Sequence, residues 1–290
     1  MRTLVFLLVL AVNGAAQPAA APPDQFFNSN EVRIRYVEQG TGPPVVLMHG
    51  YTGTLDRHFL ANGLFANLAT HHRVIAMDLR GHGKSDKPHD PAAYGEVMAE
   101  DVVRLLDHLK IPRAHVIGYS LGAIIAGRLA TLHPDRLISV AFVAQVPMRE
   151  ITPEFAKFAE DSVSELESGV PFRSLALALQ PAGSKPPTDE EIRKMVAPLA
   201  AANDVQALAA LWRGIRSLVT PDAALASVDV PMIVLIGSED ANATNVPALT
   251  KAHPRIRSQI IPGAQHGGEV GVMRRREFIT ALHEFLAGAR

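Results

Sequence analysis

The chain contains no cysteine and a single tryptophan, and neither sign of charge predominates. Without cysteine it cannot form a disulfide, and it offers no thiolate to a structural zinc ion. Its 28 Lys and Arg residues are balanced by 29 Asp and Glu residues, with no basic stripe or acidic tail. This balance argues against nucleic acid as a partner and against electrostatic binding to a membrane surface. At 290 residues and 48% hydrophobic content, the chain can form one globular core with a subdomain.

The N-terminal segment has the features of a targeting signal. Arg2 gives a positive start, residues 4–12 are apolar, and residues 14–16 form a small-residue cleavage site. We therefore expect residues 1–16 to be a signal peptide, the alternatives being an uncleaved anchor or a misassigned start. The apolar stretch is shorter than the about 20 residues that a membrane-spanning helix needs. Residues 17–25, which begin rich in Pro and Ala, are then expected to be a disordered leader.

The pentapeptide Gly118-Tyr119-Ser120-Leu121-Gly122 is the most informative motif. It joins residues 114–117, expected to be a buried strand, to residues 121–133, expected to be a helix. A strand that turns at once into a helix crowds the serine backbone, and only glycine-sized neighbours relieve the crowding. The serine oxygen would then lie at a helix N-terminus, where free N–H groups stabilise negative charge. The motif predicts a nucleophile elbow in which Gly118 and Gly122 flank Ser120.

Three further apolar segments end in residues suited to the same chemistry. Residues 45–48 lead into His49-Gly50-Tyr51, residues 231–236 lead into Gly237-Ser238-Glu239-Asp240, and residues 256–262 lead into Gly263-Ala264-Gln265-His266. If these segments are parallel strands, their carboxyl ends meet at one edge of the sheet, where open α/β sheets place their ligands. The candidate catalytic residues then follow the chain order Ser120, Asp240, His266.

These motifs and their order resemble the α/β-hydrolase superfamily, in particular its serine-nucleophile, esterase- or lipase-like members with a helical cap. The resemblance runs from about residue 32 to 289 and is loose between about 148 and 227. It implies an α/β fold: a mostly parallel eight-stranded sheet flanked by helices, with the cap inserted over the active site. Strand-like segments stop before residue 148 and resume near 231, so we expect a core of residues 26–147 and 228–290 and a cap of residues 148–227.

The other elements are expected from apolar spacing. Residues 32–39, 73–77 and 137–143 are typical of strands, and residues 91–109 are typical of a helix. The cap segment predicts helices over residues 153–166, 172–179, 189–202 and 205–218. Thr188 and Glu191 are spaced as a capping box for the third of these helices.

Residue chemistry supports a role for each catalytic candidate. A serine hydroxyl needs a base within hydrogen-bond reach, and His266, in a glycine-rich loop after the last strand, suits that role. Asp240 would hold the imidazole in the required tautomer, with Glu239 as the rival carboxylate. The only N-glycosylation sequon, residues 242–244, lies beside Asp240, where a glycan would crowd the site, and this favours a bacterial source. With no cysteine for lipid attachment, an exported form is expected to be periplasmic or secreted, without a stable membrane anchor.

By resemblance, the oxyanion hole consists of the backbone N–H groups of Tyr51 and Leu121. His49 and Gly50 then belong to the oxyanion loop. Trp212 falls in an expected cap helix, where it either packs in the core or lines the pocket.

Residues 78–86 resemble a family loop that we interpret as structural, with Asp78 and Arg80 tying it down. The alternative is a phosphate-binding loop, because Gly83-Lys84-Ser85 is present. However, Asp78 stands in place of that motif's first glycine, and Pro88 stands where a helix should begin. No H-x-E or H-E-x-x-H spacing occurs, so neither a metal nor another cofactor is expected.

A serine at the elbow favours hydrolysis of a small-molecule ester, or a related acyl bond, through an acyl-serine intermediate. Relatives that open epoxides or displace halide carry an aspartate there. The Leu-, Ala- and Val-rich cap suggests a substrate with an apolar part. Alternatives are a cofactor-free, haloperoxidase-like perhydrolase, a carbon–carbon bond hydrolase and a proline aminopeptidase. A ligand-binding protein on the same fold, with little turnover, is the alternative of another class.

Overall fold

The computed structural model describes residues 21–178 and 185–289. The expected signal peptide, residues 1–16, lies outside the described residues, as do residues 17–20 of the expected leader. Both remain predictions. Within the described ranges, no helix is long and apolar enough to cross a membrane.

A single eight-stranded sheet runs through the molecule in the order β1-β2-β4-β3-β5-β6-β7-β8. β2 pairs antiparallel with both β1 and β4, and the remaining neighbours pair in parallel. The strands are β1 Gln25–Ser29, β2 Val32–Gln39, β3 Pro44–Met48, β4 Arg73–Met77, β5 Ala114–Tyr119, β6 Leu137–Val143, β7 Met232–Gly237 and β8 Arg257–Ile261. The expected α/β fold with a mostly parallel sheet is confirmed.

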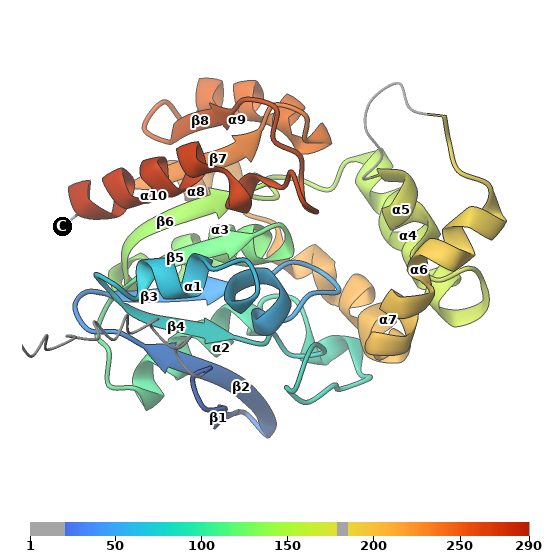
Figure 1. Cartoon of the computed structure of the whole chain (residues 1–290), viewed down its shortest axis with the longest axis horizontal. Helices are drawn as coiled ribbons and strands as arrows, with labels where there is room; N and C mark the ends of the chain where they lie inside the picture. The colour runs from blue at the N-terminus through green and yellow to red at the C-terminus, as the bar shows by residue number, and fades with distance from the viewer. Residues whose placement is uncertain (1–20, 179–184, 290) are drawn as a thin grey trace, which may run out of the picture.

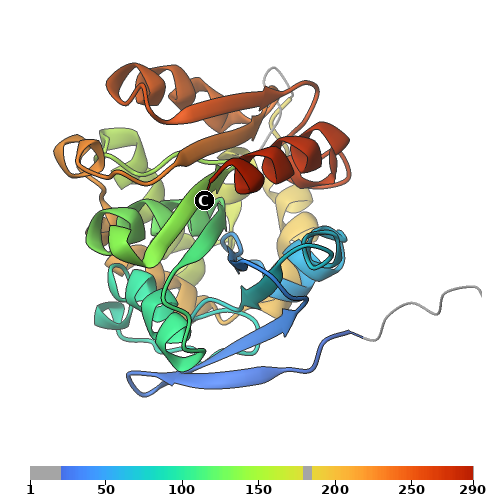
Figure 2. The same cartoon turned by 90° about the vertical axis from the view of Figure 1, so that its left-hand side faces the viewer.

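Both faces of the sheet are buried because helices cover both. Alternate residues of β3 belong to different clusters: Val46 and Met48 pack on one face, Val45 and Leu47 on the other. This is why β3 to β7 are largely apolar runs and not alternating ones. The edge strand β8 differs from the apolar strand expected over residues 256–262, because it begins Arg257-Ser258-Gln259 and only Ile261 of its residues is buried. Figure 2 shows α2 and α3 on one side of the sheet and α1 and α10 on the other.

The described α-helices outside residues 148–218 are α1 Leu64–Leu68, α2 Val97–His108, α3 Leu121–Leu132, α8 Asp222–Ala226, α9 Val246–Ala252 and α10 Arg276–Gly288. Of these, α8 lies within the segment 148–227 expected to form the cap. Shorter helical turns are η1 Asp56–Leu60, η2 Pro91–Ala93, η3 Pro134–Arg136, η4 Ile215–Leu218, η5 Ala241–Asn245 and η6 Val272–Arg274. η1 has the wider π geometry, and the other five are 3₁₀ turns.

Between β6 and β7 the described residues contain helices and no strand, and the first four of these helices cover the edge of the sheet. These four are α4 Pro153–Ser168, α5 Arg173–Ala178, α6 Asp189–Ala202 and α7 Val205–Gly214. The Thr188–Glu191 capping box is present at the start of α6. Figure 1 shows these four helices beyond the carboxyl ends of the parallel strands, which is where a site at that edge would be covered.

Two expectations need correction. The helix expected over residues 91–109 begins at Val97, because Gly95 has φ +81° and its backbone lies against Ser217, where a Cβ would meet Oγ at 1.9 Å. The leader expected over residues 17–25 ends too late. Gln25 is the first residue of β1 and pairs with Tyr36, and the Asp24 carboxylate accepts a 2.6 Å hydrogen bond from Arg35.

Candidate active site

The turn between β5 and α3 holds Ser120 in an unusual backbone conformation. Its φ is +54° and its ψ is −112°, a region that costs a non-glycine residue about 1–3 kcal/mol. The neighbours explain why glycines are needed: a Cβ on Gly118 would lie 2.2 Å from the Gly122 carbonyl oxygen, and one on Gly122 would lie 2.3 Å from the Met48 carbonyl oxygen. The Ser120 N–H donates to the Val143 carbonyl at 2.9 Å, which fixes the turn to β6.

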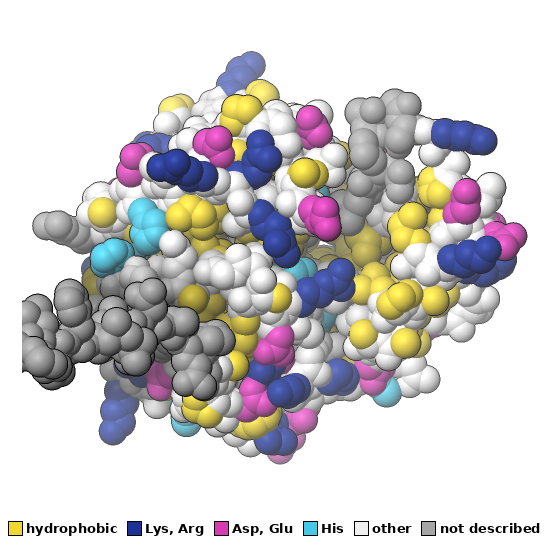
Figure 3. All heavy atoms as spheres, viewed as in Figure 1, with side chains coloured by type: hydrophobic (Ala, Val, Ile, Leu, Met, Phe, Trp, Pro, Cys, Tyr) yellow, Lys and Arg dark blue, Asp and Glu magenta, His cyan; other side chains and the backbone are white. Residues whose placement is uncertain are grey.

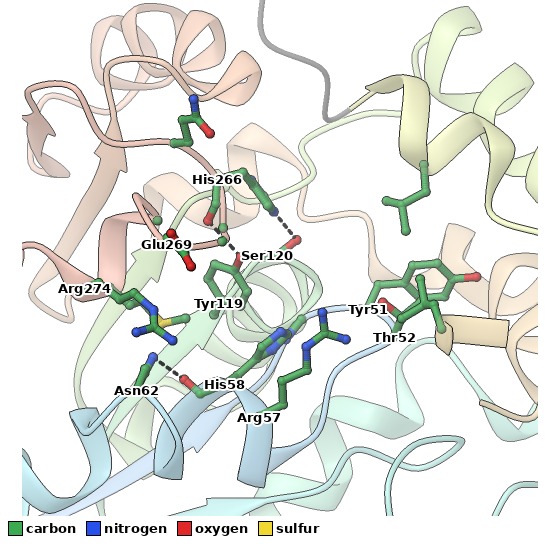
Figure 4. A pocket seen from close by; sticks show the side chains of 18 residues that line it. Tyr51, Thr52, Arg57, His58, Asn62, Tyr119, Ser120, His266, Glu269 and Arg274 are labelled. Carbon is green, nitrogen blue, oxygen red and sulfur yellow. Dashed lines mark hydrogen bonds between the residues drawn. The ribbon is translucent and has the colours of Figure 1, made fainter. Parts of the chain in front are cut away.

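The structure brings Ser120, Asp240 and His266 together from three separate loops. His266 Nδ1 lies 2.8 Å from Asp240 Oδ2, and His266 Nε2 lies 3.1 Å from Ser120 Oγ. Because a carboxylate only accepts, Nδ1 carries the proton and Nε2 is free to accept the serine proton. Figure 4 shows the His266 ring pointing at Ser120. This geometry lets the histidine act as a base toward the serine.

The two adjacent carboxylates after β7 point in different directions. The Asp240 side chain is fully buried, and its Oδ1 also accepts the Asn242 N–H at 3.0 Å. Glu239 is exposed, and its carboxylate accepts a 3.3 Å hydrogen bond from the Gln265 side chain. Only Asp240 is placed to orient the imidazole.

The loop after β3 lies directly against the serine. A Cβ on Gly50 would lie only 3.1 Å from the Ser120 Cβ, so the close approach requires glycine. Within the described part of the chain, no hydrogen bond occupies the N–H groups of Tyr51 or Leu121. Both are therefore available as donors to a developing oxyanion.

His49 anchors this loop and does not face the reacting atoms. Its Nε2 accepts the Leu79 N–H at 3.0 Å, while Nδ1 donates to the Gly50 carbonyl at 2.8 Å. Complete burial lowers the pKa of His49, so the ring is neutral and can accept that bond.

Residues 78–86 are tied into the structure by ion pairs and backbone contacts. The two Asp78 oxygens accept the N–H groups of Leu55 and Lys84 at 2.8 and 2.9 Å. The Arg80 guanidinium binds the buried Asp101 carboxylate with two hydrogen bonds of 2.7 and 2.5 Å. These contacts fit the structural interpretation of the loop.

A pocket of about 540 Å³ opens in front of Ser120. Residues from both sides line it: Gly50, Tyr51, Thr52, Arg57, His58, Asn62, Tyr119, Ser120, Gln265, His266, Gly267, Gly268, Glu269, Gly271, Met273 and Arg274 from the core, and Leu175 and Leu199 from the cap. Trp212 is not among these residues and packs edge-on against the Tyr51 ring, with centroids 5.1 Å apart. Within residues 21–178 and 185–289, no cluster of three or more His, Asp or Glu residues is arranged to hold a metal ion.

Sequence reasoning missed the residues that η1 contributes to this pocket. His58 Nδ1 accepts the Gly50 N–H at 3.2 Å, and its ring stands edge-on to Tyr119 with centroids 4.9 Å apart. Burial lowers the pKa of His58 to about 3, with smaller contributions from His49 and Arg57. A single turn of π-helix after the oxyanion loop has no periodicity that could have predicted this position.

Comparison with known protein families shows which family the chain belongs to. The model of the alpha/beta hydrolase fold family matches residues 43–266, which is more than half of the chain and includes all three residues of the Ser120–His266–Asp240 arrangement. The chain therefore belongs to the alpha/beta hydrolase fold family.

Individual relatives carry different activities. A pimeloyl-[acyl-carrier protein] methyl ester esterase of Aeromonas hydrophila is 30% identical over 262 residues, covering 85% of this chain and 96% of that protein. A thermophilic esterase of Thermogutta terrifontis has a similar structure, with a TM-score of 0.73 at 23% identity over 92% of this chain and 99% of that one. Epoxide hydrolases also match, over shorter segments.

A further relative matches only in part. The dihydrolipoyllysine-residue acetyltransferase component of an acetoin cleaving system in Pseudomonas putida is 36% identical over 149 residues. The match covers 50% of this chain and 39% of that protein. The chain thus spans well under two thirds of this relative's length.

Proposed function

We propose that the protein is a serine hydrolase that cleaves a carboxylic ester, or a related acyl bond, through an acyl-serine intermediate. The observation that carries this proposal is the hydrogen-bonded series from Asp240 through His266 to Ser120, at 2.8 and 3.1 Å. The near full-length relationship to a methyl ester esterase supports it.

In the proposed reaction, Ser120 Oγ attacks the carbonyl carbon while His266 Nε2 takes the hydroxyl proton. The carbonyl oxygen becomes an oxyanion that the N–H groups of Tyr51 and Leu121 stabilise. Collapse of this intermediate breaks the carbon–oxygen bond, and the leaving alkoxide takes the proton from His266. Water then repeats the sequence on the acyl-serine, with His266 again as the base, and releases the acid and free Ser120.

The alternative activities of the family differ in the nucleophile that they require. The family resemblance implies an aspartate at the elbow of members that open epoxides, whereas this chain has Ser120. A serine cannot form the carboxylate-ester intermediate that epoxide opening through aspartate requires, so acyl transfer is favoured. The cap residues Leu175 and Leu199 line the pocket and favour a substrate with an apolar part.

A panel of p-nitrophenyl esters and lactones of varied acyl length tests the proposal. We expect the purified protein to hydrolyse short esters, and the Ser120→Ala variant to lose roughly six orders of magnitude in kcat. A variant that keeps a tenth of the activity would rule out Ser120 as the nucleophile. No turnover of any ester or lactone by the wild-type protein would favour a ligand-binding role on the same fold.

A further inference from the structure

Arg57 projects an unneutralised charge into the pocket. The residue is exposed and lines the same pocket as Ser120 and Tyr51. Its guanidinium has no ion pair or hydrogen bond with any of the residues that the structure describes. The preceding carboxylate, Asp56, is held instead by Arg35, at 2.6 and 3.0 Å. An arginine that presents its planar set of donors to a substrate pocket is suited to a carboxylate or similar anion.

His58 supplies a second donor beside this charge. Its Nδ1 accepts the Gly50 N–H, so in the neutral ring the proton must lie on Nε2. The ring is held rigidly. Gly53 packs against it so tightly that a Cβ there would lie 2.2 Å from a ring carbon of His58, and Tyr119 supports its edge. Among the described residues, none accepts a hydrogen bond from His58 Nε2, and this atom is not fully buried. Its N–H is therefore free to bind a ligand in the pocket.

Two further charged side chains line the opposite side of the pocket. Figure 4 draws Arg274 and Glu269 on the far side of His58, whereas Arg57 lies between His58 and Thr52. No ion pair joins Glu269 to Arg274, but among the described residues that line the pocket Glu269 is the one carboxylate, and Figure 4 draws it apart from Arg57. Figure 3 shows basic and acidic side chains on the core side of the hollow and hydrophobic side chains on the cap side. The pocket therefore has charged and polar side chains on the core side and the apolar residues Leu175 and Leu199 on the cap side.

We propose that Arg57 and the Nε2–H of His58 form a subsite that selects substrates carrying a carboxylate in addition to the bond that is cleaved. This inference rests on the proposed hydrolase function and names its substrate class. The arginine would bind the carboxylate through two parallel hydrogen bonds, and His58 would donate a third. The apolar chain of the substrate would lie along the cap.

The experiment compares matched charged and neutral esters. For each protein, kcat/KM is measured for 4-nitrophenyl hydrogen glutarate and 4-nitrophenyl pentanoate, and the ratio of the two is taken. A second pair, 4-carboxyphenyl pentanoate and phenyl pentanoate, places the charge on the leaving group. We expect Arg57→Met to lower the charged-to-neutral ratio roughly ten- to a hundredfold in one of the pairs. Arg274→Met is the matched control, because it removes a second exposed arginine of the same pocket that Figure 4 draws on the other side of His58 from Arg57; it should change the ratio less than about twofold.

His58→Asn separates the second donor from the first. Asparagine can still accept the Gly50 N–H near the position of Nδ1, but it lacks a donor at the position of Nε2. We expect a smaller fall in the ratio than with Arg57→Met, with the change mainly in KM. Equal falls for Arg57→Met and Arg274→Met would mean that only overall charge matters, and an unchanged ratio in both pairs for Arg57→Met would overturn the subsite.

A binding measurement separates the failure of this inference from the failure of the hydrolase function. Calorimetric titration of glutarate into the wild-type, Arg57→Met and Arg274→Met proteins needs no turnover. Weaker binding to Arg57→Met alone supports the subsite even if no ester is hydrolysed. Hydrolysis of neutral esters with equal glutarate binding by all three proteins would refute the subsite and leave the hydrolase function intact.

Discussion

At the scale of single residues, Glu239 and Asp240 make an internal control. Both are acidic and adjacent, but only Asp240 is buried and bonded to His266. We predict that Asp240→Asn lowers kcat by roughly three to four orders of magnitude near neutral pH, because the amide favours the wrong imidazole tautomer. Glu239→Gln should change kcat by less than about threefold, since its side chain lies on the surface.

Steady-state kinetics on a short p-nitrophenyl ester, with circular dichroism to check folding, measures both variants. Equal losses would mean that local charge matters and not the specific hydrogen bond. A large loss in Glu239→Gln alone would require the catalytic acid to be Glu239.

Sequence reasoning best predicted the site residues that come shortly after strands. Ser120, Asp240 and His266 each come a few residues after a parallel strand, so the topology alone brings them to one edge of the sheet. Arg57 and His58 could not be found in this way, because they lie on a π-helical turn between β3 and α1. Their positions depend on contacts with Gly50, Gly53 and Tyr119, which are tertiary contacts.

At the scale of elements, the β5–α3 junction depends on the absence of side chains at its glycines. We predict that Gly122→Ala destabilises the protein by more than about 3 kcal/mol, because the added Cβ would lie 2.3 Å from the Met48 carbonyl oxygen and β3 cannot yield without moving the sheet. Gly288→Ala is the control: it lies at the exposed end of α10, with no atom within 4 Å of the added Cβ. It should alter stability by less than about 1 kcal/mol.

Urea unfolding followed by fluorescence of the single tryptophan measures both changes. A Gly122→Ala protein as stable as the Gly288→Ala protein would contradict the packing described for the elbow.

The elements also differ in how well the sequence predicts them, because some depend on contacts with residues elsewhere in the chain. The central strands are largely apolar runs, whereas β1 contains the polar residues Gln25, Asn28 and Ser29 and is held by its pairing with β2. The break before α2 likewise depends on Ser217, far along the chain.

At the scale of the whole molecule, buried histidines make stability depend on pH. Burial lowers the pKa of His115 to about 4, and burial also lowers the pKa values of His72 and His283 at the same end of the sheet. The ordinary histidine pKa is about 6.5, so between about pH 6.5 and 4 the unfolded chain binds more protons than the folded one. The stabilisation is therefore complete above about pH 6.5 and is lost as the pH falls toward 4.

We predict that the free energy of unfolding falls between pH 7.5 and pH 5. His115→Asn should reduce that fall by on the order of 1–2 kcal/mol, because asparagine can keep a hydrogen bond to Ser139 and does not titrate. Urea denaturation at the two pH values provides the measurement. The same dependence on pH in both proteins would show that His115 is not protonated on unfolding.

Export of the chain, which depends on residues 1–16, stays a prediction.

The central claim is that Ser120 is an activated nucleophile beside an oxyanion hole. The most direct test is to treat the protein with an alkyl fluorophosphonate and locate the adduct by mass spectrometry of the peptides. The account predicts a single adduct on the peptide that contains Ser120, and its loss in Asp240→Asn when labelling times are short. An adduct on another serine, or hydrolysis of esters by a protein that is never labelled, would contradict it.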